Sequence, residues 1–323
     1  MLKNKSLIIT SKDDAHSDFM IHKSNSLGFG DRVVRLNTED FNDNCIVSFR
    51  DGDFSVYIKD SGRELNSGEI MSVWFRRPQE IVTHHDDFGV SEYMKIQATA
   101  FLRGLYFCCH DSSLWINDLT ALHRSRIKLQ QIKNAINVGF DVPRTLVSNS
   151  PDKLIEFFDE FKMVCTKSLD EPNFMSDGVL YPMFTRVLAD RDELVNNIDS
   201  LSMCPVLFQE YIEKKSDIRV VVLGSDIFAV EIFSQENELS IHDFRGVSPT
   251  LLKHSVHELP KRILKKIRAF VEQQGLYYSA MDFVLSKDGK YYFLENNSNG
   301  QWLWLESMAG IDISGAFLRS LFG

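Results

Sequence analysis

The chain has 323 residues, of which 44% are hydrophobic and 25% charged, a balance typical of a soluble globular protein with a large core. Its formal net charge of −9 disfavours general binding to nucleic acid, because phosphate backbones are bound by basic grooves. No apolar run approaches the roughly 18 residues of a membrane-spanning helix, and the N-terminus lacks the apolar stretch of a signal peptide. We therefore expect a cytoplasmic protein whose five cysteines are reduced thiols.

The first third of the chain alternates short strands with helices. Strands are predicted where β-branched and aromatic residues cluster, at 6–10, 32–36, 45–49 and 72–75. A helix is expected from the N-cap residue Ser91 to about Cys109. Because strands and helices alternate, we expect residues 1–117 to form an N-terminal α/β domain.

The middle of the chain begins with an amphipathic helix. Apolar residues recur at helical spacing over 122–138, and Gly139 is the expected C-cap. A second helix is expected at 152–161, and a strand at 163–167 follows it. These elements belong to the predicted central small domain, residues 118–204.

The last third is expected to be rich in antiparallel strands. A strand is predicted within 205–212, and the two alternating runs of 217–234 are expected to form a hairpin about Gly224 and Ser225. A long amphipathic helix and a final hairpin complete the predicted C-terminal domain, residues 205–323.

The final hairpin brings polar residues together at its open end. Asp288-Gly289 stands between two alternating runs and indicates a two-residue hairpin turn. With that loop, Asp282 faces Glu295 across the two strands, and directly opposed residues share a face of the sheet. Asn297 lies on the same face, because it is two residues beyond Glu295. Two opposed carboxylates repel each other, so a compensating cation is expected.

Asp282, Glu295 and Asn297 offer three hard oxygen ligands on one face, a set that suits Mg²⁺. Mg²⁺ of this kind completes its octahedron with water and substrate phosphate, and so implies a nucleotide. The alternative is a solvated hairpin end with incidental acids, which the apolar surroundings of Glu295 disfavour. The sequence has neither a GxxxxGK[ST] loop nor a GxGxxG motif, so lysines and arginines elsewhere must bind the phosphates.

An ordered series of motifs runs through nearly the whole chain. It comprises SVWFRRP (72–78), WIND (115–118), KLQQIKNAINVGFDVPRTLVSNSPD (128–152), FQEYIEKKSDIRVVVLG (208–224), AVEIFSQ (229–235), HDFRG (242–246) and AMDFVLSKDGKYYFLENNSNGQWLWLE (280–306). This series resembles the ATP-grasp superfamily, and within it the graspetide, or microviridin-type, macrocyclases that mature ω-ester-containing peptides. The combination of FRRP with FLENNSNGQW is the most specific part of the resemblance.

The resemblance implies an α/β (α+β) ATP-grasp fold, in which ATP lies in a cleft between two antiparallel sheets. It implies ATP and Mg²⁺ as cofactors, with the metal on Asp282, Glu295 and Asn297. The implied partner is a ribosomal precursor peptide with a leader and a core, and the family suggests a homodimer. We expect no nucleic-acid or membrane partner.

The resemblance also assigns residues to the nucleotide. Lys128, near the start of a helix, and Lys167, at the end of a strand, match positions at which the superfamily presents lysines to phosphates. The segment FQEYI matches the linker that borders adenine. The resemblance implies that Glu210 and backbone groups of Tyr211 and Ile212 hydrogen-bond the base and the ribose, and that Gln209 belongs to the same nucleotide-binding set. The alternatives are solvated surface lysines and an ordinary half-buried strand.

Five further residues are candidates for the reacting end of the site. Lys214, Asp217 and Arg219 lie close together in KKSDIRV, where a structural salt bridge is the alternative. The resemblance implies that Arg219 and Arg245 lie near the γ-phosphate and the acceptor carboxylate, since Arg suits bidentate capture of both. Asp217 and Asp243 are possible bases, and Lys214 completes the set.

Two segments depart from the family pattern. Ser298 stands where the family usually has a proline after the metal strand. Because Glu295 and Asn297 are intact, we expect the metal site to tolerate this change. The segment 168–178, at the place of the phosphate-covering loop, has a single glycine and is interpreted either as a lid or as part of peptide recognition.

The FRRP motif is open to two interpretations. Arg76 and Arg77 are expected on opposite faces of a strand end. They could steer an acidic peptide toward the cleft, or they could pair with the acidic segment 84–87.

The reaction implied by the resemblance joins two side chains of one peptide. An Asp or Glu carboxylate of the precursor attacks the γ-phosphate of ATP, and the acylphosphate is then attacked by a hydroxyl or an amine of the same peptide. The products are a macrolactone or macrolactam, ADP and phosphate. One alternative is a ligase that adds a free amino acid to a peptide or a small acid, and another is a nucleotide-binding regulator without activity.

Overall fold

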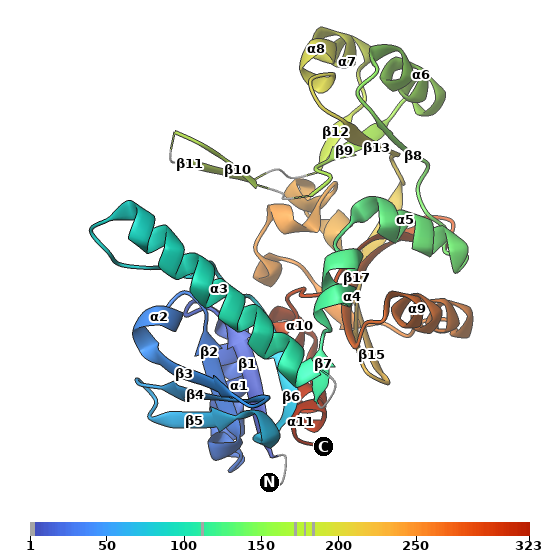
Figure 1. The fold of residues 1–323 in the computed structure, drawn as a ribbon. Helices are drawn as coiled ribbons and strands as arrows, with labels where there is room; N and C mark the ends of the chain where they lie inside the picture. Colours follow the sequence, from blue (N-terminus) through green and yellow to red (C-terminus); the bar gives the residue numbers. More distant parts are fainter. Residues whose placement is uncertain (1–3, 111–112, 171–172, 178, 183–184) are drawn as a thin grey trace.

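The computed structural model describes residues 4–110, 113–170, 173–177, 179–182 and 185–323 (Figure 1). Its helices and strands build a four-stranded parallel sheet near the N-terminus and, farther along the chain, antiparallel sheets of four and five strands. The last helix, α11 (Ile313–Phe322), returns to the first sheet and packs beside it (Figure 1). Within the described ranges, no helix is long and apolar enough to cross a membrane.

The N-terminal sheet has four parallel strands in the order β2-β1-β6-β7. They are β1 (Lys5–Thr10), β2 (Val33–Asn37), β6 (Ile70–Phe75) and β7 (Leu114–Ile116). Side chains alternate along β1, so its two faces enter two different cores. Leu7 and Ile9 lie in the core formed with α3 (Phe88–His110). Ile8 lies in the core formed with α1 (Ala15–Ser26) and α11 (Ile313–Phe322). The strand predictions in this region are confirmed.

Two features of the N-terminal part differ from the sequence predictions. Helix α3 begins at Phe88, ahead of Ser91, because the Asp87 carboxylate accepts the backbone N–H of Val90 at 3.0 Å and caps the helix. The strand predicted at 45–49 belongs to a separate antiparallel meander that the sequence did not indicate in full. Beside the short helix α2 (Phe41–Asn44), the meander consists of β3 (Cys45–Arg50), β4 (Asp53–Ile58) and β5 (Arg63–Asn66).

The helix predicted over 122–138 is two helices, α4 (Leu119–Ser125) and α5 (Lys128–Asn137). The break is stabilised by Gln131, whose side-chain amide donates to the free carbonyl of Ser125 at the end of α4. As a result Lys128 is the first residue of a new helix rather than a residue inside a longer one. Gly139 follows α5 with a positive φ of 84°, as expected for a C-cap.

The central sheet is antiparallel, with the order β12-β9-β13-β8. Its strands are β8 (Thr145–Ser148), β9 (Val164–Lys167), β12 (Arg186–Leu188) and β13 (Val206–Glu210), with helices α6 (Pro151–Phe161), α7 (Arg191–Asn196) and α8 (Ile198–Leu201). Because β13 pairs with β8 and β9, the central sheet continues past the predicted boundary at residue 204. The predicted domain division otherwise stays a prediction.

A two-stranded hairpin, β10 (Asn173–Ser176) and β11 (Val179–Pro182), extends away from the central sheet (Figure 1). It includes part of the segment 168–178 that we interpreted as a lid or a peptide-recognition element. Residues 171–172 and 178 of that segment lie outside the described residues, and the interpretation stays a prediction.

The C-terminal sheet has five antiparallel strands in the order β16-β15-β14-β17-β18. They are β14 (Lys214–Leu223), β15 (Asp226–Ile232), β16 (His254–Val256), β17 (Tyr278–Ser286) and β18 (Tyr291–Asn297), with helices α9 (Lys261–Gln274) and α10 (Leu303–Ala309). The predicted hairpin about Gly224 and Ser225 is confirmed, because Leu223 pairs with Asp226. Helix α9 buries Ile263, Ile267 and Phe270 in the core that lies against this sheet.

The final hairpin reaches the predicted pairing by a different route. Its loop is longer than two residues, since the Ser286 N–H donates to the Lys290 carbonyl at 2.9 Å. A bulge between Asp282 and Phe283 then shifts the register again, so that Asp282 faces Glu295 as predicted. The bulge lets Phe283 and Phe293 enter the core while Glu295 turns to the opposite face.

Candidate active site

A cavity lies between the central sheet and the C-terminal sheet, and most of the predicted site residues line it. The predicted residues in its lining are Lys167, Gln209, Glu210, Tyr211, Ile212, Lys214, Asp217, Asp243, Arg245, Asp282 and Glu295. Seven residues that the sequence did not indicate also line it: Pro143, Cys165, Thr185, His242, Phe244, Val284 and Leu294. Strands from far apart in the sequence therefore converge on one concave site.

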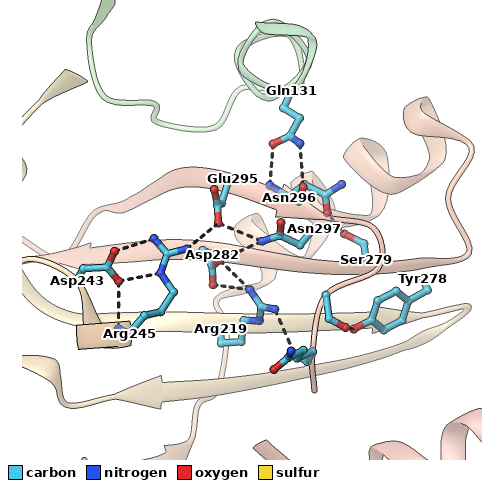
Figure 2. Close-up of polar contacts among 12 residues, drawn as sticks. Gln131, Arg219, Asp243, Arg245, Tyr278, Ser279, Asp282, Glu295, Asn296 and Asn297 are labelled. Carbon is cyan, nitrogen blue, oxygen red and sulfur yellow. Dashed lines mark hydrogen bonds and ion pairs between the residues drawn. The ribbon is translucent and has the colours of Figure 1, made fainter. Parts of the chain in front are cut away.

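The three predicted oxygen ligands meet at the end of the β17–β18 hairpin (Figure 2). The Asn297 side-chain amide lies 3.1 Å from Glu295 Oε1 and 3.5 Å from Asp282 Oδ2. Rotation of that amide by half a turn brings its oxygen to the same point. Two carboxylates and one amide oxygen form a donor set of the kind that Mg²⁺ accepts. Within the described ranges, no group of three His, Cys, Asp or Glu side chains offers an alternative metal site.

The two carboxylates of this site titrate differently. Burial, which Arg219 opposes and the nearby charge of Glu295 supports, raises the pKa of Asp282 to about 6. Burial also acts on Glu295, but Arg245 and Lys167 outweigh it and lower the pKa of that carboxyl. Glu295 is therefore the charged member of the pair near pH 6, and Asp282 becomes charged as the pH rises.

Arg219 is bound to the metal-site carboxylate itself. Its Nη1 donates to both oxygens of Asp282, at 2.8 and 2.7 Å, and its Nη2 donates to the Gln301 carbonyl at 3.2 Å (Figure 2). The guanidinium is buried, with 7% of its side-chain surface exposed. A Cβ at Gly300 would lie 2.8 Å from Nη2, so only glycine allows this close approach. This geometry gives Arg219 a partner in Asp282, and its predicted contact with phosphate stays untested.

Arg245 forms a second ion pair on the same face. Its Nε and Nη2 donate to the two oxygens of Asp243, at 2.9 and 2.7 Å, and its Nη1 lies 3.9 Å from Glu295 Oε1 (Figure 2). Burial acts to raise the pKa of Asp243, but the hydrogen bonds and charge of Arg245 dominate and hold it at about 2. A carboxylate with so little affinity for protons is a poor general base, which disfavours that predicted role for Asp243.

Asp217 and Arg219 do not pair with each other, because Arg219 binds Asp282. The ion pair within KKSDIRV joins Lys214 and Asp217, as the alternative of a structural salt bridge allowed. Lys214 Nζ lies 2.7 Å from Asp217 Oδ2, and the Ser234 hydroxyl donates to the same oxygen. Burial raises the pKa of Asp217, the charge of Asp243 adds to this, and Lys214 opposes it. Of the two predicted bases, Asp217 therefore has the higher affinity for a proton.

Two lysines approach the metal site from the other side. Lys128 begins α5 and donates to the Ser168 carbonyl, next to Lys167 on β9. Burial lowers the pKa of Lys128, the charges of Lys167 and Arg245 add to the effect, and Glu295 opposes it. Three cations thus surround Glu295, which is the arrangement that a bound polyphosphate requires.

The segment expected to border adenine is partly occupied by contacts within the protein. The Tyr211 backbone N–H donates to the Met163 carbonyl at 3.1 Å, so this N–H is not free for a base in the present structure. The Glu210 carboxylate accepts the Arg144 backbone N–H at 3.0 Å, and Gln209 donates to the Thr145 hydroxyl at 3.1 Å. Of the two predicted backbone contacts, the one at Ile212 stays the better candidate.

Sequence reasoning missed Gln131, which supports the metal strand. Its side-chain oxygen accepts the Asn296 N–H and its amide donates to the Asn296 carbonyl, both at 2.8 Å (Figure 2). The contact fixes the backbone between the two predicted ligands Glu295 and Asn297. The sequence held a signal for Gln131: its spacing of three residues places it on the same helix face as Lys128. The structure shows that Gln131 itself is buried.

Two antiparallel sheets that enclose a cleft, with carboxylate and amide side chains on one and lysine and arginine side chains around them, are the arrangement expected of the class of ATP-grasp ligases. The chain belongs to the RimK-like ATP-grasp family, whose domain matches residues 125–321. The predicted recognition and the predicted fold class are thereby confirmed, and an ATP-binding domain is established.

Solved structures resemble this one over almost its whole length. A RiPP-associated ATP-grasp ligase from Chryseobacterium gregarium, in complex with ADP and a leader and core peptide, is 28% identical, with a TM-score of 0.85 over 98% of this chain and 96% of that chain. The macrocyclase MdnC from Microcystis aeruginosa, bound with the precursor peptide MdnA, is 26% identical, with a TM-score of 0.82 over 99% of both chains.

Curated relatives match a smaller part of the chain. A probable alpha-L-glutamate ligase from Saccharophagus degradans is 28% identical over 193 residues, which cover 57% of this chain and 60% of that protein. A probable alpha-L-glutamate ligase from a Marinomonas species is 26% identical over 214 residues, covering 64% of this chain and 66% of that protein. The chain therefore spans about two thirds or less of the length of these relatives.

Proposed function

We propose that the protein is an ATP-dependent macrocyclase of a ribosomal precursor peptide. The observation that carries the proposal is the likeness, over 98% of the chain and at 28% identity, to a ligase solved with a leader and core peptide. That likeness extends well beyond residues 125–321, which the family's domain matches. The match to the probable glutamate ligase covers only 57% of the chain, and so supports the shared ATP-grasp chemistry rather than the substrate.

In this proposal Mg²⁺ binds Asp282, Glu295 and Asn297, and ATP lies in the cleft beside them. When bound, the metal supplies positive charge to the phosphate oxygens. The donor set fits the ion, since Mg²⁺ takes one or two carboxylates and leaves positions for phosphate. The ring of cations formed by Lys128, Lys167 and Arg245 would hold the phosphates against it.

The proposed first step activates an acid of the peptide. An oxygen of an Asp or Glu carboxylate attacks the γ-phosphorus, the bond from that phosphorus to the β–γ bridging oxygen breaks, and ADP leaves with the electron pair. The charge that develops on the equatorial oxygens is stabilised by Lys128, Lys167 and Arg245, because phosphoryl transfer depends chiefly on positioning and electrostatics.

The proposed second step closes the ring. A Thr or Ser hydroxyl, or a Lys amine, of the same peptide attacks the acyl carbon, and phosphate leaves as the carbon–oxygen bond to it breaks. The nucleophile loses a proton, for which Asp217 is the better of the two predicted bases. Water must be excluded from the cleft, since it would hydrolyse the acylphosphate.

The test first seeks, among the neighbouring genes, a short open reading frame rich in Thr, Ser, Asp and Glu, and then analyses the encoded peptide by mass spectrometry after incubation with the protein, ATP and Mg²⁺. The expected result is the loss of one water per ring, abolished by Glu295→Gln. An unchanged peptide with ADP still released would favour the alternative, a ligase that joins a free amino acid to another acceptor. An unchanged peptide without ADP release would favour a nucleotide-binding regulator.

A further inference from the structure

The segment that follows the metal strand is held through its backbone carbonyls. Four consecutive carbonyls, those of residues 298–301, each accept a hydrogen bond from a buried side chain. The donors are Asn117 to Ser298 (2.8 Å), Arg76 to Asn299, Tyr278 to Gly300 (2.8 Å) and Arg219 to Gln301 (3.2 Å). We call these four hydrogen bonds and their donors the clamp; together they restrain the segment 298–301 to one conformation.

The clamp continues at the start of the next helix. The His16 Nε2 atom accepts the backbone N–H groups of Trp302 and Leu303, both at 3.1 Å. Burial lowers the pKa of His16 to about 4, and the charge of Arg76 adds to this shift while Asp14 opposes it. The imidazole is therefore neutral near pH 7 and keeps the lone pair that accepts these hydrogen bonds.

Three members of the clamp come from the N-terminal part of the chain. Arg76 directly follows β6, Asn117 directly follows β7, and His16 lies in the first turn of α1. In this parallel sheet the carboxyl ends of the strands share one edge, which explains why Arg76 and Asn117 act together. Strand β18, which carries the predicted ligands Glu295 and Asn297, belongs to a different sheet. Residues at the edge of the N-terminal sheet therefore hold the segment that follows β18.

We propose that Arg76 is a positioning residue for the metal site, acting through the Asn299 carbonyl on the segment beside Asn297. This inference rests on the proposed metal site at Asp282, Glu295 and Asn297. It assigns a role to the first arginine of FRRP, for which the sequence left two interpretations open. Contacts beyond the first ligands orient those ligands, and their loss weakens metal binding.

Burial argues against both earlier interpretations of Arg76. Only 2% of its surface is exposed, so it cannot meet a peptide that arrives from solvent. Its acidic neighbour is Asp14, with Nε 3.7 Å from Oδ1, rather than the segment 84–87. Arg77, the next residue, is exposed and stays the candidate for steering a peptide.

A purely stabilising role does not account for Arg76 either. A buried Arg–Asp pair is commonly no more stabilising than apolar side chains of the same volume, because both charges are desolvated. Among the described residues, Arg76 Nε and Nη2 have no hydrogen-bond partner, which adds to that cost. The contact that an apolar side chain could not replace is the hydrogen bond to the Asn299 carbonyl.

The test compares Mn²⁺ binding, as a probe for Mg²⁺, in the ADP-bound protein without peptide. The double variant Arg76→Met/Asp14→Asn removes the donor and keeps the buried charge balanced. We expect Mn²⁺ to bind about 10- to 100-fold more weakly, with the thermal midpoint unchanged or higher. Arg77→Met is the matched control, expected to bind Mn²⁺ as the wild type does.

A second variant, Arg76→Lys, keeps the charge opposite Asp14 and covers the case in which the double variant does not fold. We expect weaker Mn²⁺ binding in this variant also, because an ammonium cannot match the geometry of the planar guanidinium. Wild-type Mn²⁺ affinity in either folded Arg76 variant would overturn the positioning role. Failure of the wild-type protein itself to bind Mn²⁺ with ADP would instead overturn the metal site, and the positioning role with it.

Discussion

The two sides of the cleft differ in how their charged residues are held. On the C-terminal sheet, Arg219 is buried and bound to Asp282, whose side chain is 13% exposed, and the Gln301 carbonyl is tied to the same guanidinium. On the central sheet, Lys167 and Glu210 are only half-buried, and the carboxylate of Glu210 contacts backbone. The hydrophobic cores behind the two sides are also separate clusters. The side proposed to bind the metal, here called the metal side, is therefore preorganised by the fold, and the side proposed to bind the nucleotide, the nucleotide side, is a more open surface.

This difference predicts which substitutions affect folding and which affect only binding. A charge removed from the metal side leaves a buried partner without compensation. A charge removed from the nucleotide side leaves groups that water can reach. The three predictions below test that contrast, in order of decreasing effect.

Arg219→Met is expected to have the largest effect on stability. It leaves the Asp282 carboxylate buried without its cation, and breaking a buried pair in this way costs about 3–5 kcal/mol in the free energy of unfolding. The matched control is Arg191→Met, whose side chain is 52% exposed and pairs with Asp159, itself 38% exposed, so that its loss should cost about 1 kcal/mol or less. Urea unfolding of the two variants measures the difference, and equal losses would contradict the contrast.

Lys167→Met is expected to weaken ATP binding without changing the unfolding midpoint. Hydrogen bonds to charged groups contribute roughly 1.5–3 kcal/mol, so the KM for ATP should rise about 10- to 100-fold. Lys162→Met is the control, because Lys162 is exposed and pairs only with Asp159 among the described residues. Steady-state ADP release measures the loss of ATP binding, and a thermal melt measures the loss of stability. A lower melting midpoint in Lys167→Met would show that this lysine stabilises the fold, against the prediction.

The pH dependence of metal binding is expected to follow Asp282, whose pKa is raised to about 6 by burial and by Glu295. Because the metal needs the carboxylate, its affinity should fall about tenfold per pH unit below pH 6. The contribution of Asp282 to the free energy of unfolding changes with pH in the opposite direction to metal affinity. It is fully present below pH 3.8 and is lost as the pH rises through about 6. Mn²⁺ titrations between about pH 5 and 8 test this, and a flat profile would contradict it.

Much of the site was predictable because its signals are local. Alternation and the Asp-Gly turn indicated that Asp282, Glu295 and Asn297 share a face, and the structure brings them together. The prediction reached the correct pair through compensating errors, since a longer loop and a bulge together restore the register. A bulge depends on which side chains the core accepts, here Phe283 and Phe293, and that is not encoded in the turn.

The sequence by itself determined the set of chemical groups: the predicted oxygen ligands, the two lysines and the arginines, most of them in a segment whose strand or helix follows from its pattern. Only the tertiary structure decided their partners. Arg219 pairs with Asp282 rather than Asp217, and Arg76 pairs with Asp14 and holds the Asn299 carbonyl. The physical reason is that a buried charge takes the partner that packing brings within reach, and packing joins residues that are far apart along the chain.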